Sequence, residues 1–218
     1  MTRAHERAPL LLGHRGARAT RHIPENTFES FELCLEHGCD GFEFDVRRSA
    51  DGVAVICHDP VIGGLEVALT PASVLKLPSL QDVLREFSGR AFLDIELKVA
   101  GLEGHLAAAL NDHPPQKGCV VSSFLPEVLR SIHRSGARIP LGFLYDHEEQ
   151  TLPTGLPVIY SAPRFTFLTS AGVAQIHAAG GMVMTWTVNR ADDMRRFAEW
   201  GVDAIISDDT QLLVQTLR

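Results

Sequence analysis

Two predicted strands, Gly41–Val46 and Ala91–Leu97, carry acidic side chains at alternate positions. Because successive side chains of a strand point to opposite faces, each strand presents its acidic residues on one face. These faces carry Glu43 and Asp45 in the first strand, and Asp94, Glu96 and Lys98 along the second. Carboxylates that share a protein interior are costly unless a cation pairs them. Three carboxylates at strand ends would form an oxygen-ligand site of the magnesium or calcium kind, with open positions for water and substrate.

Two histidines and two cationic side chains accompany these carboxylates. His14 ends the first predicted strand, and His58 directly follows the strand Val53–Cys57. Imidazole has an ordinary pKa of about 6.5, which suits a general acid and a general base. Arg15 and Lys98 would hold an anionic substrate such as a phosphodiester. The residues alone therefore suggest metal-assisted phosphoryl transfer with a histidine pair.

A sheet must position these residues, because short β-rich stretches alternate with helical stretches along nearly the whole sequence. The predicted strands are Leu10–His14, Gly41–Val46, Val53–Cys57, Ala91–Leu97, Cys119–Ser123, Leu141–Tyr145, Val158–Ser161, Met182–Val188 and Ala204–Ser207. The predicted helices are Thr27–His37, Leu80–Phe87, Leu102–Asn111, Pro126–Arg134, Ser170–Ala179, Ala191–Trp200 and Thr210–Leu217. Strands separated by helices indicate parallel pairing through crossover connections.

One hairpin interrupts the parallel pattern, since Asp51-Gly52 is a turn that joins Asp45–Arg48 to Val53–Cys57. Without the hairpin strand, the predicted strands number eight, which indicates an α/β protein with the (β/α)8 TIM-barrel fold. Function in such barrels collects at the carboxyl ends of the strands, where the polar residues above lie. A doubly wound open sheet is the alternative, but no G-x-G-x-x-G turn follows the first strand.

Length and composition favour one globular domain. The chain has 218 residues, of which 45% are apolar and 22% charged, and this excludes a disordered, collagen-like or coiled-coil chain. The sequence has no linker, low-complexity segment or repeat. We therefore expect a barrel domain over residues 10–218, preceded by a disordered or extended N-terminus at residues 1–9. The stretch Pro60–Pro78 is the predicted protruding loop.

Charge and apolar patterning restrict the partners of the protein. Lysine and arginine total 20 against 27 acidic residues, a formal charge of −7, which argues against a nucleic-acid binder. The longest apolar stretches are too short to span a bilayer or to anchor the chain in one, and we expect no secretory signal. The four cysteines show no C-x-x-C pairing and are predicted to be reduced. These features predict a cytoplasmic protein without a stable membrane anchor, and we expect a monomer or homodimer.

Eight short motifs follow one another in order, each at the end of a predicted strand or the start of a helix. They are H-R-G at His14–Gly16, P-E-N-T at Pro24–Thr27, E-F-D at Glu43–Asp45, H-D at His58–Asp59, E-L-K at Glu96–Lys98, S-S-F at Ser122–Phe124, W-T-V-N at Trp186–Asn189 and I-S-D at Ile206–Asp208. Through this ordered set the chain resembles the glycerophosphodiester phosphodiesterases, from Leu10 to about Leu213.

The resemblance implies a role for each matching residue. It implies a (β/α)8 barrel with a divalent cation, Mg²⁺ or Ca²⁺, bound by Glu43, Asp45 and Glu96. It makes His14 and His58 the catalytic pair, Arg15 and Lys98 the phosphate contacts, Glu25 a residue close to the metal site, and Trp186 a residue of the alcohol pocket. Family members usually carry a longer insertion after the H-D motif that caps the site. Here the segment Pro60–Lys76 is short, so we expect a short capping loop and a more open mouth.

Each candidate also has a structural interpretation. Glu43 and Asp45 could pair with Arg47 or Arg48, and Glu96 could form a cross-strand ion pair with Lys98. The other structural interpretations place Arg15 as a cap of the barrel mouth, Glu25 at a helix start with Asn26 as its cap, and Trp186 in the core. Asp208 and Asn189 receive no chemical role.

The resulting hypothesis is a metal-dependent hydrolase that splits glycerophosphodiesters into sn-glycerol 3-phosphate and an alcohol. The family mechanism implies acid and base roles for the histidines, with His58 expected to be the acid and His14 the base. A neighbouring glycerol hydroxyl could attack first to give a cyclic phosphate. The alternatives are a lysophospholipase D-type phosphodiesterase, a catalytically silent barrel that binds a metal and a phosphate metabolite, and a magnesium-dependent lyase of keto acids. The last would need neither His58 nor the H-D hairpin.

Overall fold

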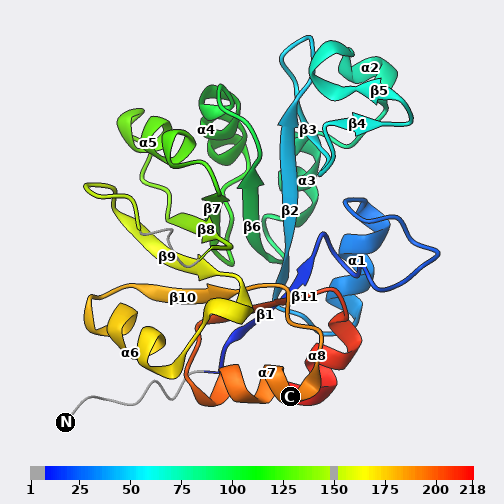
Figure 1. Cartoon of the computed structure of the whole chain (residues 1–218). Helices are drawn as coiled ribbons and strands as arrows, with labels where there is room; N and C mark the ends of the chain where they lie inside the picture. The colour runs from blue at the N-terminus through cyan, green and yellow to red at the C-terminus, as the bar shows by residue number, and fades with distance from the viewer. Residues whose placement is uncertain (1–7, 148–151) are drawn as a thin grey trace.

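Eight parallel strands form a closed ring in the computed structural model, which describes residues 8–147 and 152–218 (Figure 1). In chain order they are β1 (Leu10–His14), β2 (Gly41–Arg48), β6 (Phe92–Leu97), β7 (Cys119–Ser123), β8 (Leu141–Tyr145), β9 (Val158–Pro163), β10 (Met182–Thr185) and β11 (Ala204–Ser207). The ring closes because β1 pairs in parallel with both β2 and β11. The predicted (β/α)8 barrel is therefore confirmed, and the open-sheet alternative is wrong. Residues 1–7 of the predicted N-terminal segment lie outside the described residues.

Helices surround the ring on its outer side (Figure 1). They are α1 (Phe28–Glu36), α3 (Leu80–Phe87), α4 (Glu103–Asp112), α5 (Pro126–Arg134), α6 (Ser170–Ala178), α7 (Ala191–Glu199) and α8 (Thr210–Leu217). These match the seven predicted helices to within a few residues at each end. Among the described residues, no helix combines the length and apolar character that crossing a membrane requires.

Strand β2 shows how the sequence separates the two sides of the barrel wall. Phe42 and Phe44 point outward to the helices, and the ring of Phe31 in α1 stacks on Phe42 with centroids 4.2 Å apart. Glu43 and Asp45 alternate with these phenylalanines and so face the barrel interior. Apolar packing outside the wall thus fixes which side chains the strand presents inside.

A second apolar cluster fills the barrel beneath the carboxylates. It comprises Leu12, Phe92, Val120, Leu144, Tyr160, Ala162, Met184, Ala204 and Ile206. Interiors of this kind are packed and dry, so polar groups at its upper edge face either one another or the mouth of the barrel.

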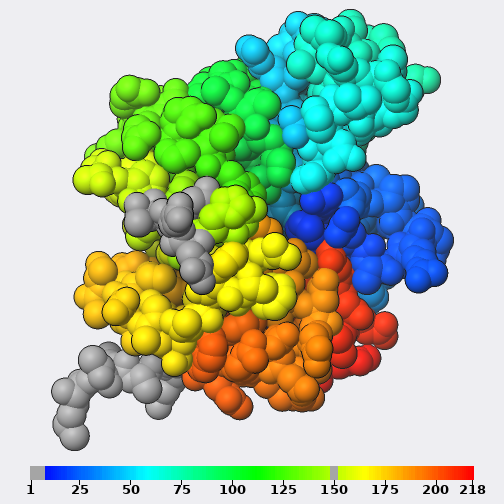
Figure 2. All heavy atoms as spheres, in the orientation of Figure 1, coloured from blue at the N-terminus to red at the C-terminus, as the bar shows by residue number. Residues whose placement is uncertain are grey.

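A small folded segment stands beside the mouth of the barrel. After the hairpin strand β3 (Ala54–Ile56), which pairs antiparallel with β2 outside the ring, the chain forms β4 (Val61–Ile62), β5 (Leu65–Glu66), η1 (Val67–Leu69) and α2 (Ala72–Leu75). We call Pro60–Lys76 the side segment; it forms the cyan lobe at the upper right (Figure 2). Val67 is buried against Val55 and Cys57 and anchors it. The predicted protruding loop is thus a folded hairpin and helix.

Replacing Phe31 by alanine should destabilise the barrel strongly. Phe31 is fully buried between Phe42, Phe44 and Phe87, and truncating such a ring costs about 3–5 kcal/mol of the free energy of unfolding. Urea denaturation measures the loss. Phe28 lies on the same helix but is 36% exposed, so Phe28→Ala is the matched control, with an expected cost of about 1 kcal/mol. Equal losses in the two variants would contradict this packing.

Candidate active site

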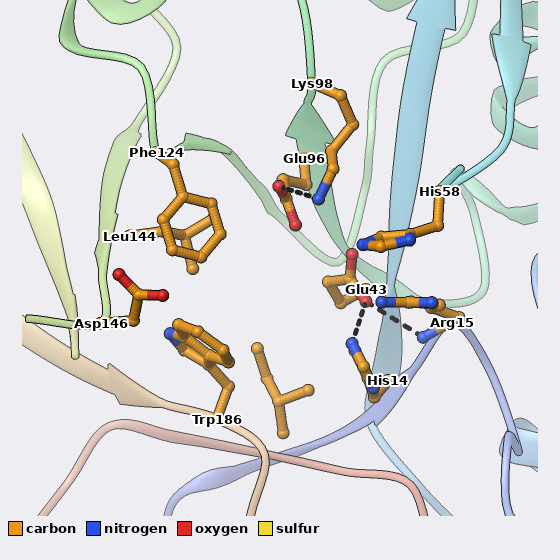
Figure 3. Close-up of a pocket in the computed structure, with 11 residues that line it drawn as sticks. His14, Arg15, Glu43, His58, Glu96, Lys98, Phe124, Leu144, Asp146 and Trp186 are labelled. Carbon is orange, nitrogen blue, oxygen red and sulfur yellow. Dashed lines mark hydrogen bonds and ion pairs between the residues drawn. The ribbon is translucent and has the colours of Figure 1, made fainter. Parts of the chain in front are cut away.

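A pocket of about 240 Å³ opens at the carboxyl ends of the barrel strands. Figure 3 shows its lining: His14, Arg15, Glu43, His58, Glu96, Lys98, Phe124, Leu144, Asp146, Trp186 and Ile206. Seven of the nine residues predicted from the sequence line it, whereas Asp45 and Glu25 are not among the lining residues. We expected the side segment to form a short cap over the site. None of its residues is among those that line the pocket, so it does not cap the site.

Three buried carboxylates come together in the wall of this pocket. In the parallel pairing of β2 with β6, Asp45 lies opposite Glu96 and Glu43 opposite Asp94. One oxygen each of Glu43, Asp45 and Glu96 can be chosen so that all lie within 4.8 Å of one another. Glu43 Oε1 is buried and accepts no hydrogen bond from any described residue. Oxygen ligands gathered in this way, with one left unpaired, are a donor set that fits a divalent cation.

The pKa values of the buried carboxylates reflect the cost of burying like charges together. Burial and the neighbouring carboxylates Asp45 and Glu96 raise the pKa of Glu43 well above its usual range. Burial raises the pKa of Glu96 to about 7, against the opposing effect of Lys98. Asp94, deeper in the barrel, accepts a hydrogen bond from the Ser122 hydroxyl, and burial raises its pKa to about 7. Without a bound cation, Glu43, Asp94 and Glu96 therefore hold protons more tightly than free carboxylates do.

Lys98 and Arg15 partly compensate this charge. Lys98 Nζ lies 2.6 Å from Glu96 Oε1 and 3.3 Å from Asp45 Oδ1, and Arg15 Nε lies 3.2 Å from Asp45 Oδ2. Burial alone would raise the pKa of Asp45, but Lys98, Arg15 and a hydrogen bond from Asn26 keep it below its usual value. The Glu96–Lys98 ion pair expected from the structural interpretation exists, yet it sits inside the pocket beside the other carboxylates.

His14 is held by a carboxylate from the far end of the chain. Its Nδ1 lies 2.7 Å from Asp208 Oδ1, and its Nε2 faces Glu43 Oε2 at 3.9 Å. Burial alone would raise the pKa of Asp208, but hydrogen bonds from His14, Asn189 and Arg18 hold it far below the usual range. Asp208 is therefore an ionised carboxylate, and it accepts a hydrogen bond from His14 Nδ1–H. This leaves His14 Nε2 facing the pocket.

His58 has a similar arrangement beside the same carboxylates (Figure 3). Its Nδ1 lies 2.7 Å from the carboxylate of the adjacent Asp59, and its backbone carbonyl accepts a hydrogen bond from Arg47 Nε at 2.6 Å. Burial lowers the pKa of His58, and the Asp59 carboxylate opposes this effect. Both imidazoles point toward the same part of the pocket (Figure 3). Two histidines, each oriented by an aspartate, can therefore exchange protons with one bound molecule.

The P-E-N-T motif contributes in a way that the sequence did not reveal. Glu25 accepts hydrogen bonds from Arg15 Nη1 at 2.7 Å and from Arg18 Nε at 2.5 Å, so it reaches the carboxylates only through Arg15. Asn26, expected as a helix cap, instead donates from Nδ2 to Asp45 Oδ2 at 2.8 Å. Thr27 caps α1 by accepting a hydrogen bond from the Ser30 amide. The interpretation of Asn26 as the cap is therefore wrong.

Trp186 forms part of an apolar wall across the pocket from the histidines. Its indole Nε1 donates to the Ala162 carbonyl at 2.9 Å, and its ring meets Phe124 edge-on with centroids 5.3 Å apart. Leu144 and Ile206 complete the wall. The side chain is thus fixed by the core and still lines the pocket, so the core and pocket interpretations of Trp186 both apply.

Polar residues without a predicted role also take part in the site. Asn26, Asp59, Asn189 and Asp208 do so through hydrogen bonds, and Asp146 lines the pocket. The first four lie inside the motifs that carried the resemblance. A histidine at a strand end needs a partner on Nδ1 to fix its tautomer, and this requirement could have directed attention to Asp59 and Asp208.

The family model for the glycerophosphoryl diester phosphodiesterase family matches residues 14–68 and 69–212. The chain belongs to this family. The protein is therefore a phosphodiesterase. The family and the enzyme class predicted from the sequence are both confirmed.

Individual relatives cover nearly the whole chain of this phosphodiesterase. A glycerophosphodiester phosphodiesterase of Caldanaerobacter subterraneus subsp. tengcongensis is 27% identical over 96% of this chain and 98% of its own length. The enzyme of the same name from Bacillus subtilis is 25% identical, over 91% of this chain and 83% of its own. A solved phosphodiesterase of Oleispira antarctica, in complex with the product sn-glycerol-3-phosphate, has a TM-score of 0.84 and 26% identity, with 96% of both chains covered.

Replacing Glu43 by glutamine should stabilise the cation-free protein. The folded state holds the Glu43 proton more tightly than the unfolded chain does, so stability falls as pH rises above about 4.3, the pKa of the unfolded chain. We expect Glu43→Gln to gain about 1–2 kcal/mol at pH 8 and nothing near pH 4. Thermal unfolding in EDTA at the two pH values measures this difference.

The same variant should lose stabilisation by added Mg²⁺ or Ca²⁺, because a glutamine cannot supply an anionic ligand. Glu199→Gln, at an exposed position of α7, is the matched control and should behave as wild type. A Glu43→Gln protein that is less stable than wild type at pH 8, or that still responds to the cation, would show that this cluster is not the site.

Proposed function

We propose that this phosphodiesterase hydrolyses glycerophosphodiesters to sn-glycerol 3-phosphate and an alcohol. The observation that carries the proposal is the convergence of two aspartate-oriented histidines, two cations and three carboxylates on one pocket. Relatives named as glycerophosphodiester phosphodiesterases over almost the full chain support the substrate class, as does the Oleispira structure with its bound product.

Glu43, Asp45 and Glu96 would hold one divalent cation, either Mg²⁺ or Ca²⁺. Such an ion, when bound, neutralises charge that develops on the phosphoryl oxygens and helps to orient the phosphate. Three carboxylates, the side chains of Arg15 and Lys98, and a divalent ion together leave one net positive charge. These groups together therefore favour an anionic diester, whereas the three carboxylates alone would repel it.

Arg15 and Lys98 bind the phosphate in this proposal. Both side chains are largely buried, with 11% and 13% of their surface exposed, and both line the pocket. Arg15 also donates its backbone N–H to Glu43 Oε2 at 3.0 Å, which joins its position to that of the acidic cluster. A fixed guanidinium beside a lysine can contact non-bridging phosphoryl oxygens while the ester oxygens remain open to the histidines.

His14 and His58 transfer the protons. Displacement at phosphorus requires a base that removes a proton from the attacking hydroxyl group and an acid that protonates the departing alkoxide. With each Nδ1 directed at an aspartate, each histidine has its Nε2 available for one of these tasks. The sequence-based expectation, His58 as the acid and His14 as the base, stays a prediction.

A lysophospholipase D-type activity is the second candidate. Four of the exposed large apolar side chains, Val61, Leu65, Leu69 and Val74, lie on the side segment beside the mouth. The segment leaves the pocket uncovered, so the acyl chain of a lysolipid would have room outside it. Inclusion of lysophosphatidylcholine in a substrate panel with glycerophosphocholine and glycerophosphoethanolamine decides between the two activities.

Removal of the divalent cation should abolish hydrolysis. After EDTA treatment and dialysis, we expect release of choline from glycerophosphocholine to fall at least about 10²-fold, because the phosphoryl charge is then opposed by the carboxylates. Addition of Mg²⁺ or Ca²⁺ should restore the rate, and the more effective ion identifies the cofactor. Glu96→Gln should require far more of that ion. Full activity in EDTA would exclude the proposed metal site.

His14→Ala and His58→Ala should each lower kcat about 10²–10⁴-fold with a smaller change in KM. His133→Ala, at an exposed position of α5, is the control and should retain wild-type kinetics. Since one histidine must be neutral and the other protonated, the wild-type rate should be bell-shaped in pH.

A glycerophosphodiester with a p-nitrophenyl leaving group assigns the two roles. This leaving group scarcely needs protonation, so it should restore the variant that lacks the acid but not the one that lacks the base. Near-normal kcat for both alanine variants on glycerophosphodiesters would refute the histidine mechanism, whatever the metal dependence.

A further inference from the structure

Arg18 lies in the loop between β1 and α1, outside the eight motifs that carried the resemblance. Its guanidinium donates hydrogen bonds to two carboxylates, from Nε to Glu25 Oε2 at 2.5 Å and from Nη1 to Asp208 Oδ1 at 3.2 Å. Glu25 belongs to the same loop, whereas Asp208 follows β11, 190 residues further along the chain. Arg18 therefore bridges the two ends of the sequence where the barrel closes.

Each of these two carboxylates holds one residue of the proposed reaction. Glu25 Oε1 accepts a hydrogen bond from Arg15 Nη1 at 2.7 Å, and Asp208 Oδ1 lies 2.7 Å from His14 Nδ1. Donors and acceptors therefore alternate along one network, in the order Arg15, Glu25, Arg18, Asp208 and His14. The phosphate contact and a proton-transferring histidine are its two ends, and Arg18 is its centre.

The backbone of the loop holds Arg18 at this place. The Ala17 amide donates to the Ser30 carbonyl in α1, and the Ala19 amide donates to the Asp208 carbonyl, both at 3.0 Å. The residues on either side of Arg18 are therefore fixed to α1 and to the end of β11. The loop thus binds Asp208 twice, through its carbonyl and through its carboxylate.

The second histidine of the pocket has no such link. Asp59, which orients His58, is 71% exposed and accepts no hydrogen bond from an arginine within the described part of the chain. Asp208 is only 19% exposed and is bound by both His14 and Arg18. The position of His14 is therefore tied to the phosphate contact in a way that the position of His58 is not.

We propose that Arg18 is a positioning residue, which keeps Arg15 and His14 in a fixed relation through Glu25 and Asp208. The inference rests on the proposed function and deepens it by naming a residue outside the motifs on which the rate depends. A phosphate on Arg15 then presents an ester oxygen to His14 in one orientation. Alignment of this kind lowers the energy of the transition state more than that of the bound substrate.

Replacing Arg18 by alanine should therefore slow the reaction without unfolding the protein. With Mg²⁺ or Ca²⁺ present, we expect kcat for glycerophosphocholine to fall about tenfold and KM to change less than about threefold. The Arg18 side chain is 40% exposed, so its ion pairs add little stability and the melting temperature should fall by less than about 3 °C. Arg21→Ala, at an exposed position of the same loop, is the matched control and should keep wild-type kinetics.

Chemical rescue tests whether the bridge itself is needed. Free guanidinium ion, at concentrations far too low to denature the protein, can fill the space left in Arg18→Ala and donate to both carboxylates. It should raise kcat of this variant at least about threefold, whereas methylammonium at equal ionic strength should not, because it lacks the planar fork. Neither ion should raise kcat of the wild type or of Arg21→Ala.

Double-mutant cycles show whether Arg18 acts through its two partners. Added to Glu25→Gln or to Asp208→Asn, the Arg18→Ala change should lower kcat by less than about threefold more, because part of the network is already broken. Added to Asp59→Asn, which alters the partner of the other histidine, it should lower kcat by the full factor of about ten.

The outcomes separate this inference from the function on which it rests. Normal kcat in Arg18→Ala, a loss confined to KM, no response to guanidinium, or full additivity with both carboxylate variants would overturn the positioning role while the proposed function stands. If the wild-type protein hydrolyses no glycerophosphodiester with Mg²⁺ or Ca²⁺ present, the proposed function fails and this inference fails with it.

Discussion

The burial of Glu43, Asp45 and Glu96 at one end of the barrel is the constraint on which the rest of the site depends. Like charges in a low-dielectric interior repel one another and lose their hydration. Arg15 and Lys98 offset part of this cost, but Glu43 Oε1 remains without a hydrogen bond from the described residues. A cluster selected only for stability would pair every buried oxygen. The unpaired Oε1 of Glu43 is therefore consistent with a ligand that binds in the pocket.

The second organising feature is that two oriented histidines and an apolar wall share one small pocket. Asp208 and Asp59 fix the two imidazoles, so that both Nε2 atoms are available to the same bound molecule. The apolar wall across the pocket comprises Phe124, Leu144, Trp186 and Ile206, and Lys98 reaches it, with Nζ 5.8 Å from the centroid of the Phe124 ring. In the proposed function, the phosphate contacts, the two histidines and the apolar wall are supplied by different strand ends. Such division is what allows one barrel frame to support many chemistries.

The alternation of apolar and acidic side chains within single strands was enough to predict which side chains face the pocket. Glu43 and Asp45 lie between outward phenylalanines, so the side of the wall on which they lie follows from the local sequence. Contacts between distant segments did not follow, because no local pattern says that Asp208 meets His14, 194 residues away. Asn26 was missed for another reason: its backbone is left-handed, with φ of 58°, which takes it out of the cap position and turns it toward Asp45.

The central proposal is that the carboxylate cluster would hold a divalent cation close to both histidines of the pocket. ¹⁵N-histidine NMR with Mn²⁺, a paramagnetic ion that binds the same oxygen ligands as Mg²⁺, tests it directly. One equivalent of Mn²⁺ should broaden the ring signals of His14 and His58. The signal of His177, which pairs with Asp203 ahead of the amino end of β11, should stay sharp. Sharp His14 and His58 signals with bound Mn²⁺, or preferential broadening of His177, would contradict the account.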